Sequence, residues 1–280
     1  MAEGLHAHEV TLGYGDRAVV RTLSVRVPPG QITVIVGPNA CGKSTLLRGL
    51  ARLLHPSHGR VVLDGHDVHR MSTRAVALRL GILPQQPVAP DGMRVADLVG
   101  RGRYPHHRFF DRWSDSDDEA VAAALLATGT AELADRAVDE LSGGQRQRVW
   151  IAMALAQRTG ILLLDEPTTF LDVTHQVEVL DLLTDLNRRD GVTLVLVLHD
   201  LNLAARYAHH LIVMKGGDLV AEGVPADVIT ESTVADVFGL ASRVVPDPVS
   251  GTPMVVPIGR YHGGLPPIET PPTPLRVKKG

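Results

Sequence analysis

The stretch "ITVIVGPNACGKSTLLRGLARLL" (residues 32–54) carries the features that decide the fold. Residues 32–37 form a continuous, largely β-branched run, which is typical of a strand buried on both faces of a parallel sheet. A loop containing two glycines follows, and leucines then recur at helical spacing over residues 45–54. The stretch therefore predicts a strand, a loop and a helix in direct succession.

Two further apolar runs, "ILLLDE" (161–166) and "VTLVLVLHD" (192–200), have the same buried-strand character. The helical pattern of residues 175–189 separates them, and this alternation predicts βαβ units in a parallel sheet. Residues 9–36 alternate between apolar and polar side chains, which favours a strand-rich opening segment. We therefore expect an α/β fold.

Residues 87–158 interrupt this rhythm with helical patterns and no strong strand signal, which indicates an inserted helical subdomain. Ser116, followed three residues later by Glu119, predicts the capped start of one of its helices. The segment "LPPIETPPTP" (265–274) is too rich in proline to build a core, and we expect it to lack a fixed structure.

Composition narrows the class of protein. The 280 residues are 44% hydrophobic, with a formal net charge of -3 and a pI near 6.5, so nucleic acid is not an expected partner. The one cysteine, Cys41, excludes an intrachain disulfide and fits a reducing compartment. The first residues show no export-signal pattern, and the apolar runs are shorter than the ~20 residues of a membrane span.

The loop from Gly37 to Ser44 fits the pattern G-x-x-x-x-G-K-[ST] in the required strand–loop–helix context. Loop amides at a helix N-terminus form a pocket for phosphate oxygens, to which Lys43 adds a positive charge and Ser44 a Mg²⁺-binding hydroxyl. A chance glycine turn is the alternative reading. Ala40 would strain the loop if its own φ is positive, because its Cβ disfavours that conformation. Cys41 lies near Lys43 and a helix N-terminus, so we expect its thiol to be reactive, with a lowered pKa.

Polar side chains follow the two later strands at the point where each is expected to end. Asp165 and Glu166 close the run 161–166, and His199 closes the third run. In parallel sheets these carboxyl ends form the ligand-binding edge, so Asp165 can hold Mg²⁺ and Glu166 can orient or deprotonate a water. A neutral His199 could hydrogen-bond a phosphate or that water, although histidines at strand ends are more often structural.

The stretch "LSGGQ" (141–145) leads into the helical sequence "QRQRVWIAMALAQ" and predicts a second helix N-terminus suited to anions. The alternative to an anion-binding role is a glycine turn that only caps the helix. Because the first loop already supplies one phosphate site, this turn would be a second one in the same chain.

Four motifs together resemble the ATP-binding cassette of the ABC transporter family: GPNACGKST (37–45), LSGGQ, LLLDEPT (162–168) and His199. Their order and spacing match that family over nearly all of residues 9–240. The resemblance implies a P-loop NTPase core with a parallel sheet, an N-terminal antiparallel β subdomain and the inserted helical subdomain at about 87–158. It assigns one cassette to residues 1–260 and leaves 261–280 as a proline-rich tail.

In that family the LSGGQ loop contacts the γ-phosphate of ATP held by the other subunit. The resemblance thus implies ATP and Mg²⁺ as ligands and a second cassette, with a homodimer favoured, as partner. It implies catalytic roles for Glu166, His199 and Gln85, with Gln86 as a rival of Gln85, and Mg²⁺ ligands from Ser44, Gln85 and Asp165. The implied nucleotide contacts are Tyr14, which would stack on adenine, then Gly37, Pro38, Asn39, Ala40, Cys41, Gly42, Lys43, Ser44 and Thr45, and Ser142, Gly143, Gly144, Gln145 and Asp172.

Within the family, residues 101–113, the LSGGQ helix and the stretch after Asp165 are similar to ATPases of ferric-siderophore importers, of the ferric enterobactin type. The resemblance implies a peripheral protein at the cytoplasmic face of the membrane, bound to a permease that an extracytoplasmic siderophore-binding protein loads. Haem or cobalamin import, iron-sulfur assembly, and a stand-alone P-loop kinase or GTPase are the alternatives.

The stretch "RGRYPHHRFFDRW" (101–113) groups Tyr104, Phe109, Phe110 and Trp113 with basic residues such as Arg103, His106 and Arg108. Aromatic residues and arginine are enriched at interface cores, so this stretch predicts the permease-docking surface. Neighbouring acidic residues, including Asp117, disfavour nucleic-acid binding, and a metal site at His106 and His107 is the weaker alternative.

Overall fold

The computed structural model describes residues 4–108, 111–169 and 171–259. Its centre is a six-stranded sheet in the order β10-β9-β3-β8-β7-β6. All neighbouring pairs in it are parallel except the hairpin β9–β10, so the predicted parallel α/β core is confirmed. The bounds are β3 Ile32–Val36, β6 Leu80–Leu83, β7 Ile161–Asp165, β8 Thr193–Val197, β9 His210–Lys215 and β10 Asp218–Gly223.

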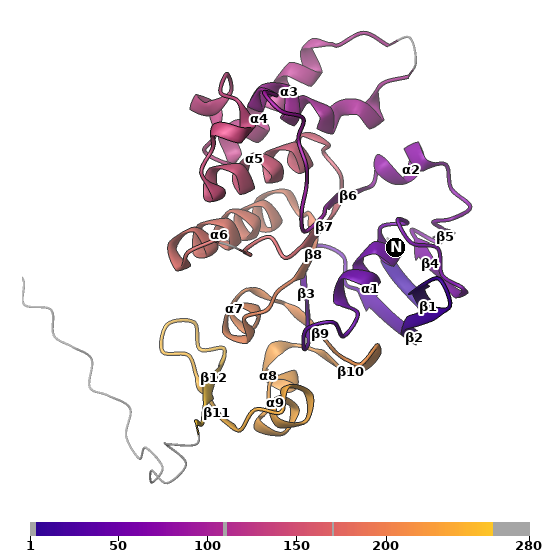
Figure 1. The fold of residues 1–280 in the computed structure, drawn as a ribbon, viewed down its shortest axis with the longest axis vertical. Helices are drawn as coiled ribbons and strands as arrows, with labels where there is room; N and C mark the ends of the chain where they lie inside the picture. The colour runs from indigo at the N-terminus through magenta and orange to yellow at the C-terminus, as the bar shows by residue number, and fades with distance from the viewer. Residues whose placement is uncertain (1–3, 109–110, 170, 260–280) are drawn as a thin grey trace, which may run out of the picture.

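The strand order differs from the chain order. β3 pairs with β8, where Ile35 faces Val197, and β7 pairs with the other edge of β8, where Asp165 faces Val197. β6 completes that side of the sheet beside β7. The carboxyl ends of four strands from distant parts of the sequence therefore meet at one edge of the sheet (Figure 1).

Both faces of the sheet are covered, as the unbroken apolar strands require. Along β3, Val34 and Val36 belong to one hydrophobic cluster and Ile35 to another. The first cluster joins the sheet to helices that include α6 (Val173–Asp190) and α7 (Leu201–Tyr207). The second joins it to α1 (Lys43–Leu50) and the N-terminal strands.

A separate antiparallel sheet in the order β2-β1-β4-β5 lies beyond α1 (Figure 1). The opening segment supplies β1 and β2, and the chain after α1 supplies β4 and β5. The strands of this sheet are β1 Leu5–Tyr14, β2 Arg17–Val27, β4 His58–Leu63 and β5 His66–Asp67, and the short helix α2 (Thr73–Ala77) follows. Helix α1 ends at Leu50, four residues short of the predicted 45–54 pattern. The backbone turns at Arg52 (φ 63°), which leaves Leu53 exposed, while Leu54 still packs against the second hydrophobic cluster from outside the helix.

The predicted inserted region is helical. It contains α3 (Val95–Gly100), α4 (Asp115–Ala127), α5 (Gly143–Ala156) and the 3-10 turns Arg101–His106, Ala131–Leu133 and Val138–Glu140. The predicted cap of α4 was wrong: Ser114, not Ser116, is its N-cap, and Asp117 replaces Glu119 as the reciprocal partner. The register moves because Asp117 is buried against Arg103, which fixes the first turn of the helix.

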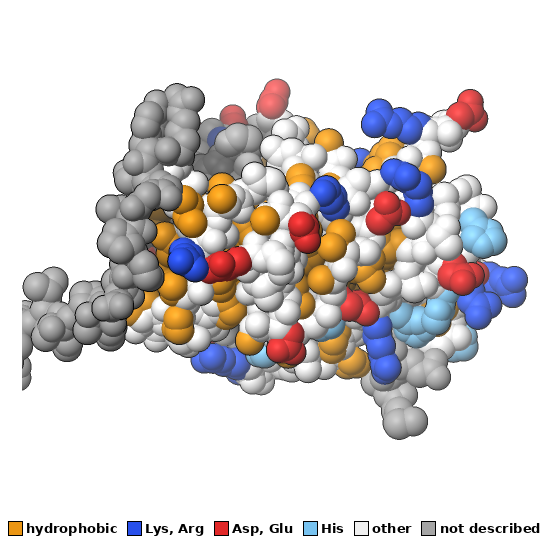
Figure 2. All heavy atoms as spheres, turned by 90° about the horizontal axis from the view of Figure 1, so that it is seen from below, with side chains coloured by type: hydrophobic (Ala, Val, Ile, Leu, Met, Phe, Trp, Pro, Cys, Tyr) orange, Lys and Arg blue, Asp and Glu red, His pale blue; other side chains and the backbone are white. Residues whose placement is uncertain are grey.

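The last elements are α8 (Pro225–Val228), α9 (Glu231–Phe238) and the hairpin β11 (Ser242–Pro246) with β12 (Pro253–Pro257). They lie at the end of the molecule opposite the helical subdomain (Figure 1). On the face seen from this end, acidic and basic side chains are interspersed among apolar ones (Figure 2). No helix in the described ranges combines the length and apolarity that a bilayer crossing demands. The predicted tail, residues 261–280, lies outside the described residues.

Candidate nucleotide site

The loop between β3 and α1 has the conformation that a phosphate cradle needs. Gly37 (φ 155°) and Gly42 (φ 106°) adopt backbone angles that favour glycine, and a Cβ on Gly37 would lie 2.2 Å from the Met214 carbonyl oxygen. The Lys43 ammonium is buried and donates to the Gly37 and Pro38 carbonyl oxygens at 2.9 and 3.0 Å. The loop thus wraps around its own lysine at the start of the helix.

Two expectations for this loop have different outcomes. Ala40 has a φ of 59°, so the predicted backbone strain at this position is present. The prediction of a lowered Cys41 pKa was wrong: burial raises the pKa of the thiol and outweighs the opposing effect of Lys43. The sulfur lies against Gly37, where an added Cβ would approach it to 2.8 Å, so Cys41 is a packed core residue.

Ser44 and Asp165 come together from α1 and β7, and the serine hydroxyl donates to Asp165 Oδ1 at 2.8 Å. Burial raises the pKa of Asp165, and the neighbouring charge of Glu166 adds to this, while the Ser44 hydrogen bond opposes it. Two oxygens bound to one Mg²⁺ at adjacent octahedral positions lie about 3.0 Å apart. The hydroxyl and carboxylate oxygens therefore fit a shared magnesium ion in both chemistry and spacing.

Glu166 lies at the centre of a second polar cluster. Its carboxylate contacts His199 Nε2 at 2.6 Å, accepts from Gln85 Nε2 at 2.6 Å, and accepts from the Thr169 hydroxyl at 3.0 Å. Burial acts to raise the pKa of Glu166, but the bonds from His199 and Thr169 outweigh it and lower the pKa. Glu166 itself has a φ of 54°, an uncommon backbone angle that places strain at this point of the chain.

The three partners of Glu166 come from different strand ends: Gln85 follows β6, Thr169 lies in the turn after β7, and His199 follows β8. The hydrogen bond goes to Gln85 rather than to the adjacent Gln86. A cavity of about 550 Å³ runs from the phosphate loop to this cluster. Arg17 and Val19 of β2 also line this cavity. The sequence did not predict them as site residues, because the alternation of a strand does not show that it will lie beside the phosphate loop.

Tyr14 is half exposed at the end of β1, and its hydroxyl accepts from Arg48 of α1 at 3.1 Å. This contact places the ring beside the helix that starts at Lys43. Tyr14 is not among the residues that line the cavity within the described part of the chain.

The second loop begins α5 as its sequence indicates. The Ser142 hydroxyl accepts from the Gln145 amide at 3.3 Å, and Gln145 Oε1 accepts from the Ser142 amide at 3.1 Å. Asp172 caps α6 in a similar way, accepting from the His175 amide at 2.9 Å. No described residue of 142–145, nor Asp172, lines the cavity around the chain's own phosphate loop.

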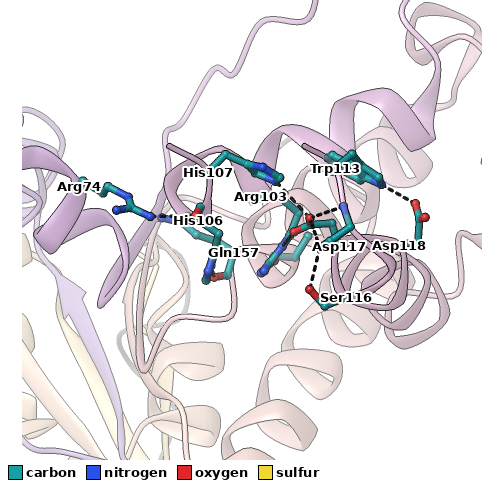
Figure 3. A network of polar contacts seen from close by, with 11 residues as sticks. Arg74, Arg103, His106, His107, Trp113, Ser116, Asp117, Asp118 and Gln157 are labelled. Carbon is teal, nitrogen blue, oxygen red and sulfur yellow. Dashed lines mark hydrogen bonds and ion pairs between the residues drawn. The ribbon is translucent and has the colours of Figure 1, made fainter. Parts of the chain in front are cut away.

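The stretch 101–113 is partly exposed and partly buried, and several of its side chains join one polar network (Figure 3). Arg103, predicted on a docking surface, is buried and forms an ion pair with Asp117 at 2.9 Å; Asp117, expected to repel phosphates, is buried with it. Tyr104 and Trp113 are exposed, whereas Phe109 and Phe110 lie outside the described residues.

The two histidines of this stretch have separate partners (Figure 3). His106 Nε2 pairs with the Gln157 carbonyl oxygen at 2.8 Å, and His107 Nε2 lies 3.2 Å from Asp117. Across the described ranges no group of three or more potential ligand side chains is placed to hold a metal ion, so the weaker metal-site alternative gains no support.

The fold and site define a P-loop nucleotide-binding protein: a buried strand, a G-x-x-x-x-G-K-[ST] loop that opens a helix, and carboxylates at a neighbouring strand end. The family model for ABC transporters matches residues 20–169. The chain belongs to the ABC transporter family and is an ATPase of that family. The resemblance drawn from its motifs is thereby confirmed.

Individual relatives agree with the family assignment. The ferric enterobactin transport ATP-binding protein FepC of Escherichia coli (strain K12) is 53% identical over 256 residues, which is 91% of this chain and 94% of FepC. An inward-facing ABC transporter described as metal-chelate type has a TM-score of 0.80 at 28% identity, covering 93% of this chain and 99% of that one. The dimeric cassette MJ0796 has a TM-score of 0.71 at 28% identity, and the match covers 79% of this chain and 98% of MJ0796.

Proposed function

We propose that this chain is the ATP-hydrolysing subunit of an importer that takes up ferric siderophores across the cytoplasmic membrane. The observation that carries the hydrolytic part is the placement of Glu166 between His199 and Gln85, on the cavity that also holds the phosphate loop. The likeness to FepC supports the transport part.

In the proposed mechanism, the loop amides and Lys43 bind the β- and γ-phosphates of ATP. Ser44 and Asp165 would hold Mg²⁺, which neutralises phosphate charge when bound. Gln85 donates to Glu166 Oε2, whereas His199 contacts Oε1, and in this proposal Gln85 would contact that ion or the attacking water.

Glu166, whose lowered pKa keeps it ionised near neutral pH, accepts a proton from the attacking water. The water oxygen forms a bond to the γ-phosphorus while the bond between that phosphorus and the β–γ bridging oxygen breaks. ADP and phosphate then leave. His199 donates a hydrogen bond to Glu166 Oε1 and thereby keeps the carboxylate aimed at the water.

The second half of the site comes, in this proposal, from another copy of the chain. Ser142, Gly143, Gly144 and Gln145 would cover the γ-phosphate bound to the partner copy, and Asp172 would cross to that copy beside them. The dimeric MJ0796 cassette supports this arrangement, as does the absence of these residues from the described lining of the cavity. ATP then joins two copies, and hydrolysis releases them.

The test uses a Glu166→Gln variant, which keeps the side-chain shape but cannot accept the proton. With MgATP it should form a stable dimer by light scattering and hydrolyse ATP at least about a hundredfold more slowly than wild type. With ADP it should be monomeric. A Glu166→Gln chain that stays monomeric in saturating MgATP, with its own Ser142 on its own nucleotide, would overturn the proposal.

The permease partner is proposed to dock on the exposed part of residues 101–113, which includes Tyr104 and Trp113. This surface would lie at the cytoplasmic face of the membrane, and an extracytoplasmic binding protein would deliver the siderophore to the permease. A Tyr104→Ala/Trp113→Ala variant should keep the basal ATPase rate of the isolated chain and lose co-purification with the permease. Leu126→Ala, at another exposed apolar residue of the subdomain, is the matched control. Unchanged co-purification of the double variant would remove this surface from the proposal.

The cargo is tested by uptake in a deletion strain. Ferric siderophore uptake should disappear and return with the wild-type gene, but not with Glu166→Gln. Loss of cobalamin or haem uptake instead, with siderophore uptake intact, would replace the proposed cargo with the corresponding chelate.

A further inference from the structure

His175, on the first turn of α6, lies between the two turns that the proposed function assigns to the partner copy's nucleotide. Its ring nitrogen Nδ1 donates to Asp172 Oδ1 at 2.7 Å. The opposite edge of the ring faces the LSGGQ turn: a Cβ built on Gly144 would lie 2.8 Å from Cδ2 and 3.3 Å from Nε2. The imidazole therefore fills the space between Asp172 and Gly144.

The His175 ring leaves no room for a Cβ at Gly144. Gly144 lies within α5 and does not have a positive φ, so backbone geometry alone would accept alanine. Real Cβ atoms do not approach another heavy atom to 2.8 Å, and here that atom belongs to a ring whose other edge is held by Asp172. The imidazole thus sets how closely the two turns approach each other.

A polar contact in the described part of the chain also joins α5 to α6. Arg148 and Glu178 form an ion pair at 3.4 Å about one turn further along both helices, and both side chains are partly exposed. Pairs of this kind contribute ~0–1 kcal/mol and leave freedom of movement. The His175 side chain is also partly exposed, at 40%, but it packs closely against Gly144 of α5 while its hydrogen bond to Asp172 orients the ring.

We propose that His175 is a positioning residue, which holds the Ser142–Gln145 turn and the Asp172 turn at one spacing so that both engage the partner copy's nucleotide together. The proposal rests on the proposed function, because it concerns the half of the site that acts in trans. Asp172 also accepts from the His175 backbone amide, so a change of the side chain leaves the N-cap of α6 in place.

The first experiment measures MgATP-dependent dimerisation in the Glu166→Gln background. Adding His175→Ala should raise the dimer dissociation constant about tenfold, within the range seen for coupled neighbouring residues. The affinity of the monomer for MgATP, measured with a fluorescent ATP analogue below the dimerisation concentration, should not change. Glu178→Ala is the matched control, since it removes the ion pair between α5 and α6, and it should leave dimerisation unchanged.

Conservative variants separate the two contacts of the ring. His175→Asn keeps a donor for Asp172, and His175→Phe keeps a ring against Gly144, so each should recover part of the lost dimerisation. Equal defects in His175→Ala, His175→Asn and His175→Phe would show that neither contact carries the effect.

A second experiment addresses the close approach directly. Gly144→Ala should impair dimerisation because its Cβ meets the imidazole, and His175→Ala should restore part of it in that background. If Glu166→Gln fails to dimerise at all, the proposed function fails. If it dimerises equally with and without the His175 side chain, the inference about His175 is wrong and the proposed function stands.

Discussion

Removal of the Asp117 carboxylate should strongly destabilise the helical subdomain. This side chain is buried at the start of α4, where Oδ1 accepts from Arg103 Nε at 2.9 Å. Oδ2 accepts from the hydroxyl and amide of Ser114 at 2.6 and 3.0 Å, and His107 lies 3.2 Å away (Figure 3). Asp117→Ala therefore leaves the Arg103 guanidinium buried with only the Ala156 carbonyl as an acceptor among these contacts.

Breaking a buried ion pair by removing one partner costs about 3–5 kcal/mol. A solvent-open cavity of about 510 Å³ borders this pair, so water can partly replace the carboxylate. We therefore expect the lower end, about 3 kcal/mol, a large share of the ~5–15 kcal/mol that stabilises a typical domain.

The assay is urea unfolding at pH 7 and 25 °C, followed by circular dichroism. Asp118→Ala is the control, because Asp118 is exposed and accepts only from Trp113 at 2.6 Å among the contacts of this network; it should change stability by less than about 1 kcal/mol. Replacing both charges, in Asp117→Leu/Arg103→Met, should recover much of the loss, since no charge then remains buried alone. A loss below about 1 kcal/mol for Asp117→Ala would refute the reasoning.

The pH dependence has a defined sign. Burial acts to raise the pKa of Asp117, but the bonds from Ser114 and Arg103 outweigh it and hold the pKa well below its usual range. Because the folded pKa is depressed, this stabilisation is fully present above the unfolded value of about 4 and is lost as the pH falls below it. The difference between wild type and Asp117→Ala should therefore shrink between pH 5 and pH 3.

Three further predictions concern other parts of the chain. Ala40→Gly should raise the free energy of unfolding by about 1 kcal/mol in urea titration, because φ is 59° there; a loss of stability would contradict this. Cys41 should react with a maleimide far more slowly than a cysteine placed at exposed Leu53 in a Cys41→Ser chain, and equal rates would show that the thiol is accessible. The Arg206 guanidinium lowers the pKa of Asp247 to about 2. This ion pair should therefore anchor the C-terminal hairpin above pH ~4 and weaken as the pH falls toward 2. Amide protection factors in the hairpin should fall accordingly, and equal protection factors at pH 6 and pH 3 would count against the prediction.

Local patterns predicted much of the core. The three buried runs became β3, β7 and β8, and the pattern 175–189 lies within α6, because strand and helix periodicity depend on neighbouring residues alone. Where the prediction failed, distant contacts decided. The pairing of Asp117 with Arg103 moved the cap of α4 to Ser114, and the backbone turn at Arg52 ended α1 at Leu50 and left Leu53 exposed.

By itself the sequence determined the chemistry of the chain: a phosphate loop with Lys43 and Ser44, acidic residues at a strand end, and a second anion-binding turn, because each is encoded by adjacent residues. Only the tertiary structure decided which of these groups meet. The order β3-β8-β7-β6 brings Gln85, Glu166 and His199 to one sheet edge, and burial makes Cys41 a core residue. Strand order and burial arise from packing between elements that are far apart in the chain, and no local pattern records them.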